Sequence, residues 1–150
     1  QKMDYGYHGY YTPNRLQWQD ELIKHVVTKT EPIHRPWLIY SCGAMGAGKG
    51  HVMRWLTAQN FIPMEKAVRI DPDVFKAVMP EFDGYVGIDK FRSGTYCHTE
   101  SGAIQEIALE ASLRMSQNIW VDGSLRNTEW YREQIQDVRD RFPQYRIAIF

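Results

Sequence analysis

The segment Gly43-Ala44-Met45-Gly46-Ala47-Gly48-Lys49 constrains the fold of this chain more than any other feature. It matches the pattern G-x-x-x-x-G-K, in which a glycine-rich loop surrounds phosphate oxygens with its backbone N–H groups. An apolar run, 37–42, precedes the loop, and a pattern with helical spacing, 51–59, follows it. A strand, a glycine-rich turn and a helix in this order predict a phosphate-binding loop at the carboxyl edge of a parallel sheet.

The residue types of this loop suit the binding of phosphate. Glycines let the backbone approach an anion without a Cβ clash, and the following helix directs its positive end toward the same place. The Lys49 side chain adds a positive charge for the β and γ phosphates. We therefore expect the following residues to bind a nucleotide: Gly43, Ala44, Met45, Gly46, Ala47, Gly48, Lys49, Gly50 and His51.

The position after the lysine departs from the usual pattern. A serine or threonine hydroxyl normally binds Mg²⁺ there, but this chain has Gly50, followed by His51. Imidazole suits Mg²⁺ poorly, because this ion prefers oxygen ligands. We therefore expect Mg²⁺ to be held through water and other groups, or to bind weakly.

Strand and helix patterns alternate along the rest of the chain. Short apolar runs predict strands at 37–42, 67–70, 118–121 and 145–150, and helical spacing predicts helices at 14–28, 51–59, 74–79, 98–116 and 128–141. The stretch 81–96 has three glycines and mixed charges, so we expect a loop over the site. The alternation predicts an α/β sandwich of the P-loop NTPase type, with a mainly parallel central sheet flanked by helices.

An N-terminal segment precedes this alternation. Residues 1–13 are rich in tyrosine and glycine and are interpreted as an extended arm that packs its tyrosines. We interpret 1–36 as this arm and a helix packed on a core domain of residues 37–150. In the helix at 98–116, the buried face is expected to contain Ile104, Ile107, Ala108, Ala111 and Met115.

Charge and composition disfavour several classes of partner. Eighteen Lys and Arg balance 18 Asp and Glu, so no overall positive charge favours nucleic acid or an anionic membrane. The apolar runs are far shorter than the roughly 20 residues of a membrane span, and no secretory signal pattern opens the sequence. Cys42 and Cys97 could form one bridge at most, but free thiols in a reduced cytoplasmic protein are the preferred interpretation.

Acidic side chains follow two of the predicted strands. Asp71 and Asp73 come directly after the second strand, and Asp122 comes after the third. Ligands in such folds bind beyond the carboxyl ends of the strands, so these carboxylates are expected near the phosphate loop. Asp71 could equally cap the next helix. Asp122 is expected to hold Mg²⁺, directly or through water, and Arg126 could bind a phosphate bidentately.

The order of these motifs resembles the zeta-toxin family of P-loop kinases. The segments are GAMGAGKG, RIDPDVFKAVMPEF, HTESGAIQEIALEASL and IWVDGSLRN, and the resemblance spans 37–150. It implies a kinase that uses ATP and Mg²⁺ to phosphorylate a hydroxyl of a small molecule. Bacterial members of the family phosphorylate the sugar of UDP-N-acetylglucosamine, so a UDP-sugar is the expected acceptor.

The resemblance also implies roles for single residues. Lys49 would be the phosphate-loop lysine, and Asp73 would be the general base that accepts the acceptor's proton. Lys49, Asp73 and Arg126 are thus the expected catalytic residues. The residues expected to bind the acceptor are Asp71, Glu106, Asp122, Ser124 and Arg126.

Several alternatives stay open at this point. Family members continue past the last predicted strand into a lid segment with arginines, so the core is expected to be C-terminally incomplete. The DGSLR segment also resembles nucleoside monophosphate kinases, and a polynucleotide kinase is a third possibility. Gly50 favours a nucleotide-binding regulatory module with little turnover. An antitoxin-like inhibitor is a conceivable partner, although no sequence motif points to one.

Overall fold

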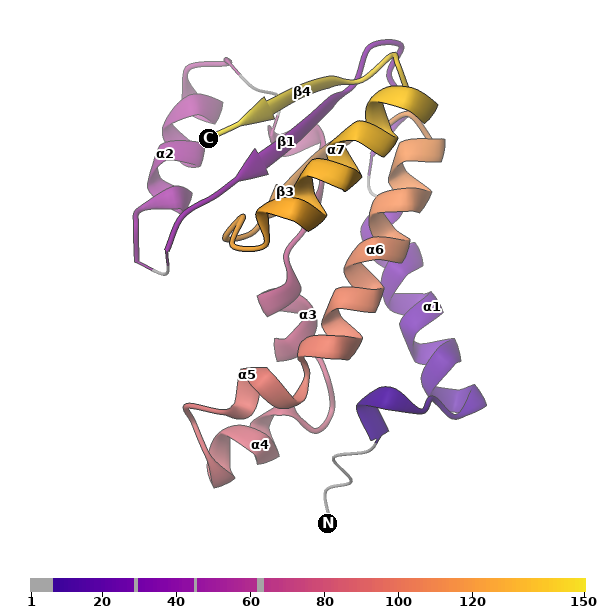
Figure 1. The fold of residues 1–150 in the computed structure, drawn as a ribbon, viewed down its shortest axis with the longest axis vertical. Helices are drawn as coiled ribbons and strands as arrows, with labels where there is room; N and C mark the ends of the chain where they lie inside the picture. Colours follow the sequence, from indigo (N-terminus) through magenta and orange to yellow (C-terminus); the bar gives the residue numbers. More distant parts are fainter. Residues whose placement is uncertain (1–6, 29, 45, 62–63) are drawn as a thin grey trace.

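A parallel sheet of four strands lies at the centre of residues 7–28, 30–44, 46–61 and 64–150, the parts of the chain that the computed structural model describes (Figure 1). The strands are β1 (Trp37–Ser41), β2 (Ala67–Ile70), β3 (Asn118–Asp122) and β4 (Arg146–Ile149). Their order in the sheet is β2-β3-β1-β4, and each pair is parallel. The predicted α/β fold with a parallel sheet is therefore confirmed.

Helices connect the strands and cover both faces of the sheet. They are η1 (Tyr7–Gly9), α1 (Pro13–Val27), α2 (Lys49–Ala58), η2 (Met64–Lys66), α3 (Pro72–Ala77), α4 (Phe82–Ile88), α5 (Ser93–Tyr96), α6 (His98–Arg114) and α7 (Thr128–Arg141). The start of α1 follows from its sequence, because Pro13 suits a first turn and the Thr12 hydroxyl accepts the Arg15 N–H at 3.3 Å. The division of the chain at residue 36 stays a prediction.

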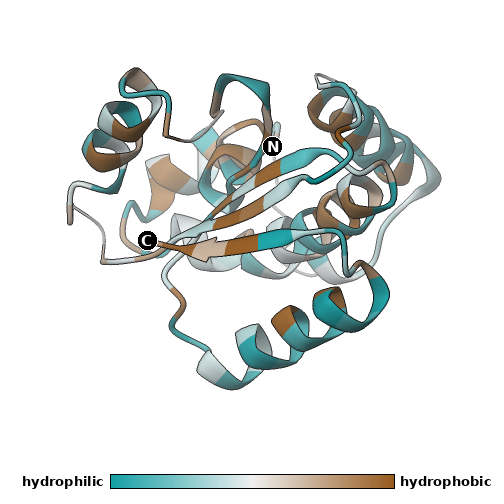
Figure 2. Ribbon diagram, turned by 90° about the horizontal axis from the view of Figure 1, so that it is seen from above, coloured by the Kyte–Doolittle hydropathy of each residue, from teal (hydrophilic) through white to brown (hydrophobic). Residues whose placement is uncertain are grey.

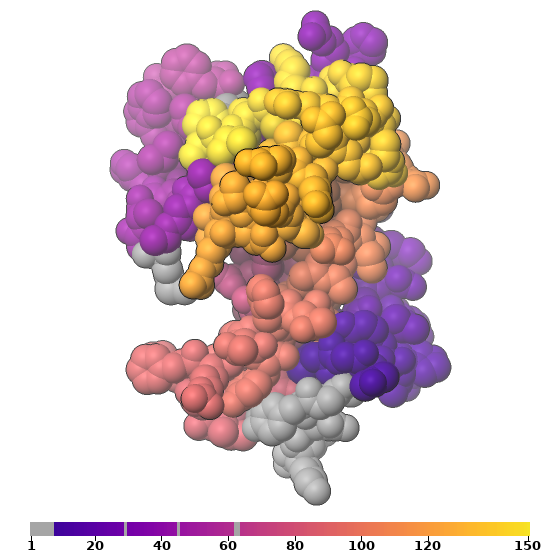
Figure 3. All heavy atoms as spheres, viewed as in Figure 1, coloured from indigo at the N-terminus to yellow at the C-terminus, as the bar shows by residue number. Residues whose placement is uncertain are grey.

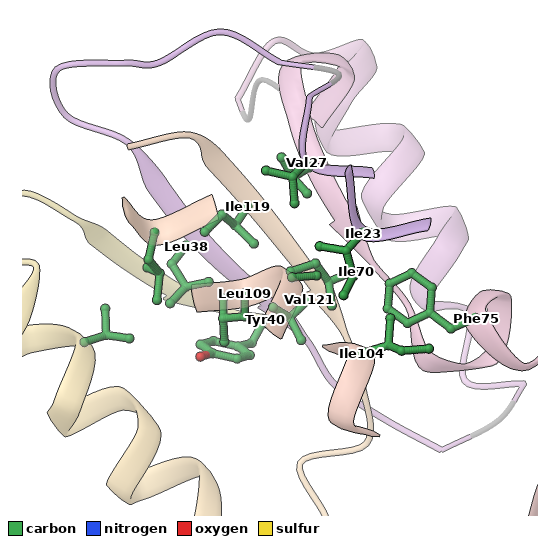
Figure 4. Close-up of a cluster of buried hydrophobic side chains, with 14 of the residues drawn as sticks. Ile23, Val27, Leu38, Tyr40, Ile70, Phe75, Ile104, Leu109, Ile119 and Val121 are labelled. Atoms are coloured by element: carbon green, nitrogen blue, oxygen red, sulfur yellow. The ribbon is translucent and has the colours of Figure 1, made fainter. Parts of the chain in front are cut away.

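Two apolar clusters hold the layers together. The larger one joins α1, α3, α6 and α7 to one face of the sheet, and its buried side chains include Ile23, Leu38, Phe75, Ile104 and Val121 (Figure 4). The smaller one packs Met53 of α2 against Ile39 on the other face. Hydrophobic segments occur along the strands and recur along the helices, where they alternate with hydrophilic ones (Figure 2).

The stretch 81–96 is helical, so its prediction as a loop is wrong. It forms the short helices α4 and α5, which project from the body of the molecule (Figure 3). Glycines weaken both helices locally, but tertiary contacts outweigh this cost. The Tyr85 ring is completely buried and its hydroxyl hydrogen-bonds His8 Nε2 at 2.8 Å. No sequence pattern within 81–96 indicates this contact, because its partner lies 77 residues away.

The buried face of α6 differs from the predicted one. Ile107 and Met115 are 52% and 41% exposed, whereas the polar side chains of Glu100 and Gln105 are buried. The helix packs against α1 as well as against the sheet, and α1 supplies partners for buried polar groups. A pattern of apolar residues alone cannot show a face that is buried through paired charges.

The N-terminal arm was also predicted incorrectly where the structure describes it. A short 3-10 helix replaces the extended chain at Tyr7–Gly9, and the buried side chain is that of His8, while Tyr10 is 85% exposed. Residues 1–6 lie outside the described part. Cys42 and Cys97 are both free, as predicted, and Cys97 is buried. None of the described helices is long and apolar enough to cross a bilayer.

Candidate active site

The phosphate loop leads from β1 into α2 through glycines in the left-handed region. Gly43 has φ +141° and Gly48 has φ +81°. A side chain at Gly43 would be strained by this backbone conformation, although its Cβ would only touch the Cβ of Ala47 at 3.4 Å. Met45 lies outside the described residues. The loop therefore has the open backbone that phosphate binding requires.

Lys49 is the first residue of α2 and its side chain folds back over the loop. Its Nζ donates hydrogen bonds to the carbonyl oxygens of Gly43 at 2.9 Å and Ala44 at 3.5 Å. The positive end of the α2 dipole lies at the same place. The loop, the helix start and the lysine together form a site with positive potential, which suits the phosphates of a nucleotide.

A cavity of about 350 Å³ at the carboxyl ends of the strands brings together the phosphate-loop lysine and the acids predicted to follow the strands. Its lining comes from the phosphate loop, α3 with its cap, α6 and the segment that runs from the end of β3 into α7. It consists of Gly43, Lys49, Asp71, Pro72, Asp73, Lys76, His98, Ser101, Gly102, Gln105, Asp122, Gly123, Ser124 and Tyr131. The surface is indented between the residues that lead into α7 and those of α4 and α5 (Figure 3). The three acids predicted to follow the strands, Asp71, Asp73 and Asp122, thus share one cavity with Lys49.

Asp71 acts as a helix cap. Its Oδ1 accepts the backbone N–H groups of Asp73 at 3.0 Å and Val74 at 3.4 Å, and its Oδ2 accepts Arg69 Nη2 at 2.7 Å. The alternative that the sequence left open for Asp71 is therefore realised. Because both carboxylate oxygens are engaged, Asp71 fixes the start of α3, the helix that carries Asp73.

Asp73 is the accessible carboxylate of this pair. It is 77% exposed, and its Oδ1 lies 3.0 Å from Lys76 Nζ one turn along α3. Lys76 itself is only 14% exposed and also lines the cavity. The sequence prediction missed Lys76, although its spacing of three residues from Asp73 on a helix was the available signal.

Asp122 ends β3, and its position is set by Ser41 on the neighbouring strand. The Ser41 hydroxyl donates to Asp122 Oδ1 at 3.0 Å and accepts the indole N–H of Trp120 at 2.7 Å. Within the described residues, no three His, Cys, Asp or Glu side chains gather as a metal site. A metal ion at Asp122 would therefore need further oxygen ligands from phosphates and water.

A second cavity of about 720 Å³ adjoins the first. It contains the predicted residues Glu106 and Arg126 and is lined by His98, Gly102, Gln105, Glu106, Ser124, Arg126, Asn127, Trp130 and Tyr131. His98, Gly102, Gln105, Ser124 and Tyr131 line both cavities and so form their common boundary. Glu106 of α6 and Arg126 of the loop before α7 both line this second cavity.

Sequence reasoning missed the aromatic side chains of this boundary. Tyr131 makes edge-to-face contacts with Tyr40 and Trp130, with ring centroids 5.7 Å and 4.8 Å away. Any Cβ at Gly123 would lie 2.7 Å from the Tyr131 hydroxyl, so the glycine makes room for it. Burial, with smaller effects of Cys42 and Asp122, raises the pKa of Tyr131 and keeps the phenol protonated. Tyr131 can therefore donate a hydrogen bond beside Asp122.

Gly50 and His51, which follow Lys49, line neither of these two cavities. Gly50 lines a separate cavity with Arg54 and Trp120, behind α2, and His51 is exposed on α2. Their predicted roles in nucleotide binding stay predictions. Ser124 is exposed, and its hydroxyl accepts the Arg126 backbone N–H at 3.3 Å.

The family model described as zeta toxin matches residues 20–150. The chain belongs to the zeta-toxin family. A similar solved structure is a chain of the PezAT chromosomal toxin–antitoxin system of Streptococcus pneumoniae, with a TM-score of 0.77 and 19% sequence identity. The alignment covers 95% of this chain and 58% of that chain, so this chain spans little more than half of its neighbour. No curated protein matches it significantly. The zeta-toxin fold accounts for the parallel sheet and the phosphate loop.

Proposed function

We propose that this zeta-toxin family protein is an ATP-dependent phosphotransferase with an alcohol acceptor. One observation carries the proposal: Lys49, Asp73 and Asp122 line a single cavity that borders a second one. The first cavity begins at the phosphate loop, and the second contains Glu106 and Arg126. This arrangement offers one place for a phosphate donor and an adjoining place for an acceptor.

The residues of the first cavity suit ATP and Mg²⁺. The glycine backbone and Lys49 would hold the phosphates, and Asp122 would hold Mg²⁺ together with phosphate oxygens and water. Mg²⁺ bound in this way neutralises charge on the transferred phosphate. Because ATP is the donor, we expect the protein to act in the cytoplasm.

Asp73 is our candidate for the general base. It is exposed to the cavity, and its ion pair with Lys76 keeps the carboxylate in place. A carboxylate so placed can accept the proton of an acceptor hydroxyl as the oxygen attacks. Lys49 and Arg126 would stabilise the charge of the transferred phosphate.

The second cavity favours a small acceptor with both phosphate and hydroxyl groups, such as a UDP-sugar. The Arg126 guanidinium can bind phosphate bidentately, and Glu106 can accept hydrogen bonds from sugar hydroxyls. The Trp130 ring adds a flat apolar surface against which a base or sugar can pack. Ser124 completes the set of residues that we assign to contacts with the acceptor, and Asp71 contributes by capping the helix that carries Asp73.

An antitoxin-like inhibitor is a further proposed partner, because the structural neighbour comes from a toxin–antitoxin system. A second candidate function is nucleotide binding with little turnover. Gly50 favours it, because this residue lacks the hydroxyl that usually binds Mg²⁺ after the phosphate-loop lysine.

Single-turnover transfer from labelled ATP to UDP-sugars, mononucleotides and oligonucleotides separates these functions. Replacing the candidate base, Asp73→Asn, should lower the transfer rate by about 10² or more with little change in ATP affinity, because the carboxylate acts on the acceptor's proton. The matched control is Asp83→Asn, which changes an exposed acid in the first turn of α4.

Equal rates in the Asp73→Asn variant and the wild type would remove Asp73 as the base. If the wild type and all variants bound ATP but labelled no acceptor, only the second candidate function, nucleotide binding with little turnover, would remain. Transfer to oligonucleotides but not to UDP-sugars would instead assign a polynucleotide kinase.

A further inference from the structure

Ser41, the last residue of β1, joins two side chains of β3. It is 2% exposed, and its hydroxyl contacts Asp122 Oδ1 at 3.0 Å and Trp120 Nε1 at 2.7 Å. Ser41 and Asp122 are opposite each other in the parallel pairing. Side chains alternate between the faces of a strand, so Ser41 and Trp120 lie on the face that α2 covers.

The hydrogen bonds of Ser41 run in one direction. An indole N–H can only donate, so Trp120 occupies a lone pair of the Ser41 hydroxyl oxygen. Ser41 has a single hydroxyl proton, and the Asp122 carboxylate is the acceptor within reach. The chain of donors therefore runs from Trp120 through Ser41 to Asp122, and it holds one carboxylate oxygen of Asp122 in place.

The indole of Trp120 is itself fixed from its other side. The Arg69 guanidinium lies 4.7 Å from the Trp120 ring centroid, and the two residues are opposite each other across β2 and β3. Arg69 also donates to Asp71 Oδ2 at 2.7 Å. Asp71 caps the helix that carries Asp73. A continuous series of contacts through Trp120 and Arg69 therefore connects Asp122 to the helix of Asp73.

We propose that Trp120 and Ser41 form a relay that positions Asp122, and this inference rests on the proposed function. Ser41 and Trp120 act through Asp122 and are positioning residues. Because Gly50 offers no hydroxyl for Mg²⁺, the orientation of Asp122 has a larger share in holding the metal than in chains with Ser or Thr at that position.

Two substitutions break the relay at different bonds. Ser41→Ala removes the hydroxyl, and Trp120→Phe removes the N–H but keeps a ring under Arg69. Each variant should raise the Mg²⁺ concentration needed for half-maximal turnover. At limiting Mg²⁺ it should lower kcat/KM for ATP about tenfold, as expected for a lost hydrogen bond to a charged group.

The controls change the same residue types elsewhere. Trp37 lies on the same face at the other end of β1, under the Arg146 guanidinium at 4.2 Å, so Trp37→Phe should leave the Mg²⁺ dependence unchanged. Ser112 is buried and donates to the Ala108 carbonyl at 2.8 Å, so Ser112→Ala reports on the loss of any buried hydroxyl.

Calorimetric titration of ATP with and without Mg²⁺ separates this proposal from the proposed function. Loss of the Mg²⁺-dependent gain in ATP affinity in Ser41→Ala and Trp120→Phe, but not in the controls, supports the relay even if no acceptor is phosphorylated. An unchanged gain in both relay variants overturns it while leaving the phosphotransferase proposal intact. Absence of ATP binding by the wild type would overturn both.

Discussion

At the scale of single residues, Gly50 is the position where this chain departs most from other phosphate loops. It is the second residue of α2, and a Cβ placed there would lie 3.6 Å from Arg54 Nη1, which is an ordinary contact. The backbone at Gly50 does not require glycine, unlike that at Gly48 with φ +81°. The fold would therefore accept a serine or threonine at position 50, and the missing hydroxyl is not imposed by the backbone.

Gly50→Ser should stabilise the protein and strengthen Mg²⁺ binding. Serine in a helix is better than glycine by about 0.5 kcal/mol, and its hydroxyl takes the usual place of a Mg²⁺ ligand. Urea unfolding measures the first effect, and the ATP affinity at several Mg²⁺ concentrations measures the second. Gly50→Ala is the control, because it improves the helix without adding a ligand. If the ATP affinity of the Gly50→Ser and Gly50→Ala variants depended on Mg²⁺ in the same way, a hydroxyl at this position would not bind the metal.

Asp71 and Asp73 show how far the sequence can specify single residues. Both were expected near the phosphate loop because they follow a strand, and both line the cavity. Only the structure separates them, since Asp71 is engaged by α3 and Arg69 whereas Asp73 is 77% exposed. The two residues are neighbours in one short segment, so their different burial depends on how β2 and α3 pack.

At the scale of elements, a buried charge network fastens the N-terminal segment to α6. Glu100 has no exposed surface and accepts hydrogen bonds from His8 at 2.5 Å, Arg15 at 2.7 Å and Gln19 at 2.6 Å. Arg15 also bonds Glu81 at 3.2 Å, beside α4. The network thus connects η1, α1 and α4 to the helix that lines both cavities.

The Glu100 carboxylate should make the free energy of unfolding depend on pH in the acidic range. Burial alone would raise its pKa, but hydrogen bonds from His8, Arg15 and Gln19 lower it from 4.5 to about 2. Because the pKa is lower in the folded state, the full contribution is present above pH 4.5 and is lost as the pH falls toward 2. The shift corresponds to about 3 kcal/mol of unfolding free energy, which urea unfolding across this pH range measures.

Glu100→Gln should flatten this pH dependence. It should also destabilise the protein at pH 7 by ~3 kcal/mol, because the buried Arg15 guanidinium then loses the negative charge of Glu100. Glu110→Gln is the control on the same helix. Glu110 is 36% exposed and pairs with Arg141 and Arg114 at the surface, where such pairs contribute at most about 1 kcal/mol. Equal losses in the two variants would contradict a special role for Glu100.

At the scale of the whole molecule, the site is assembled from four separate parts of the chain. The phosphate loop, α3, α6 and the segment from the end of β3 into α7 each supply residues to the first cavity. A ligand that contacts all four should therefore stabilise the entire fold. Binding at a hundredfold excess over the Kd contributes about 2.7 kcal/mol.

ATP with Mg²⁺ should accordingly raise the Tm of the wild type by about 5–10 °C, and Lys49→Ala should lose most of this increase. Thermal unfolding followed by circular dichroism measures both. Lys66→Ala, which changes an exposed lysine of η2, should keep the full increase. The same increase in the Lys49→Ala variant would show that ATP binds elsewhere.

The sequence by itself determined the phosphate loop, the parallel α/β fold and the family. These features are local or periodic: the spacing of Gly43 and Lys49, the apolar strands, and the acids that follow them. Local patterns survive in any packing of the chain, which is why they can be recognised without a structure.

Only the tertiary structure decided which side chains share the site and what holds them. Ser41 and Trp120 are 79 residues apart, and His8 and Glu100 are 92 residues apart. Such contacts leave no trace in a local pattern, because they arise when strands and helices from distant parts of the chain pack together. The same reason explains why α4, α5 and the buried polar face of α6 were not predicted from apolar spacing.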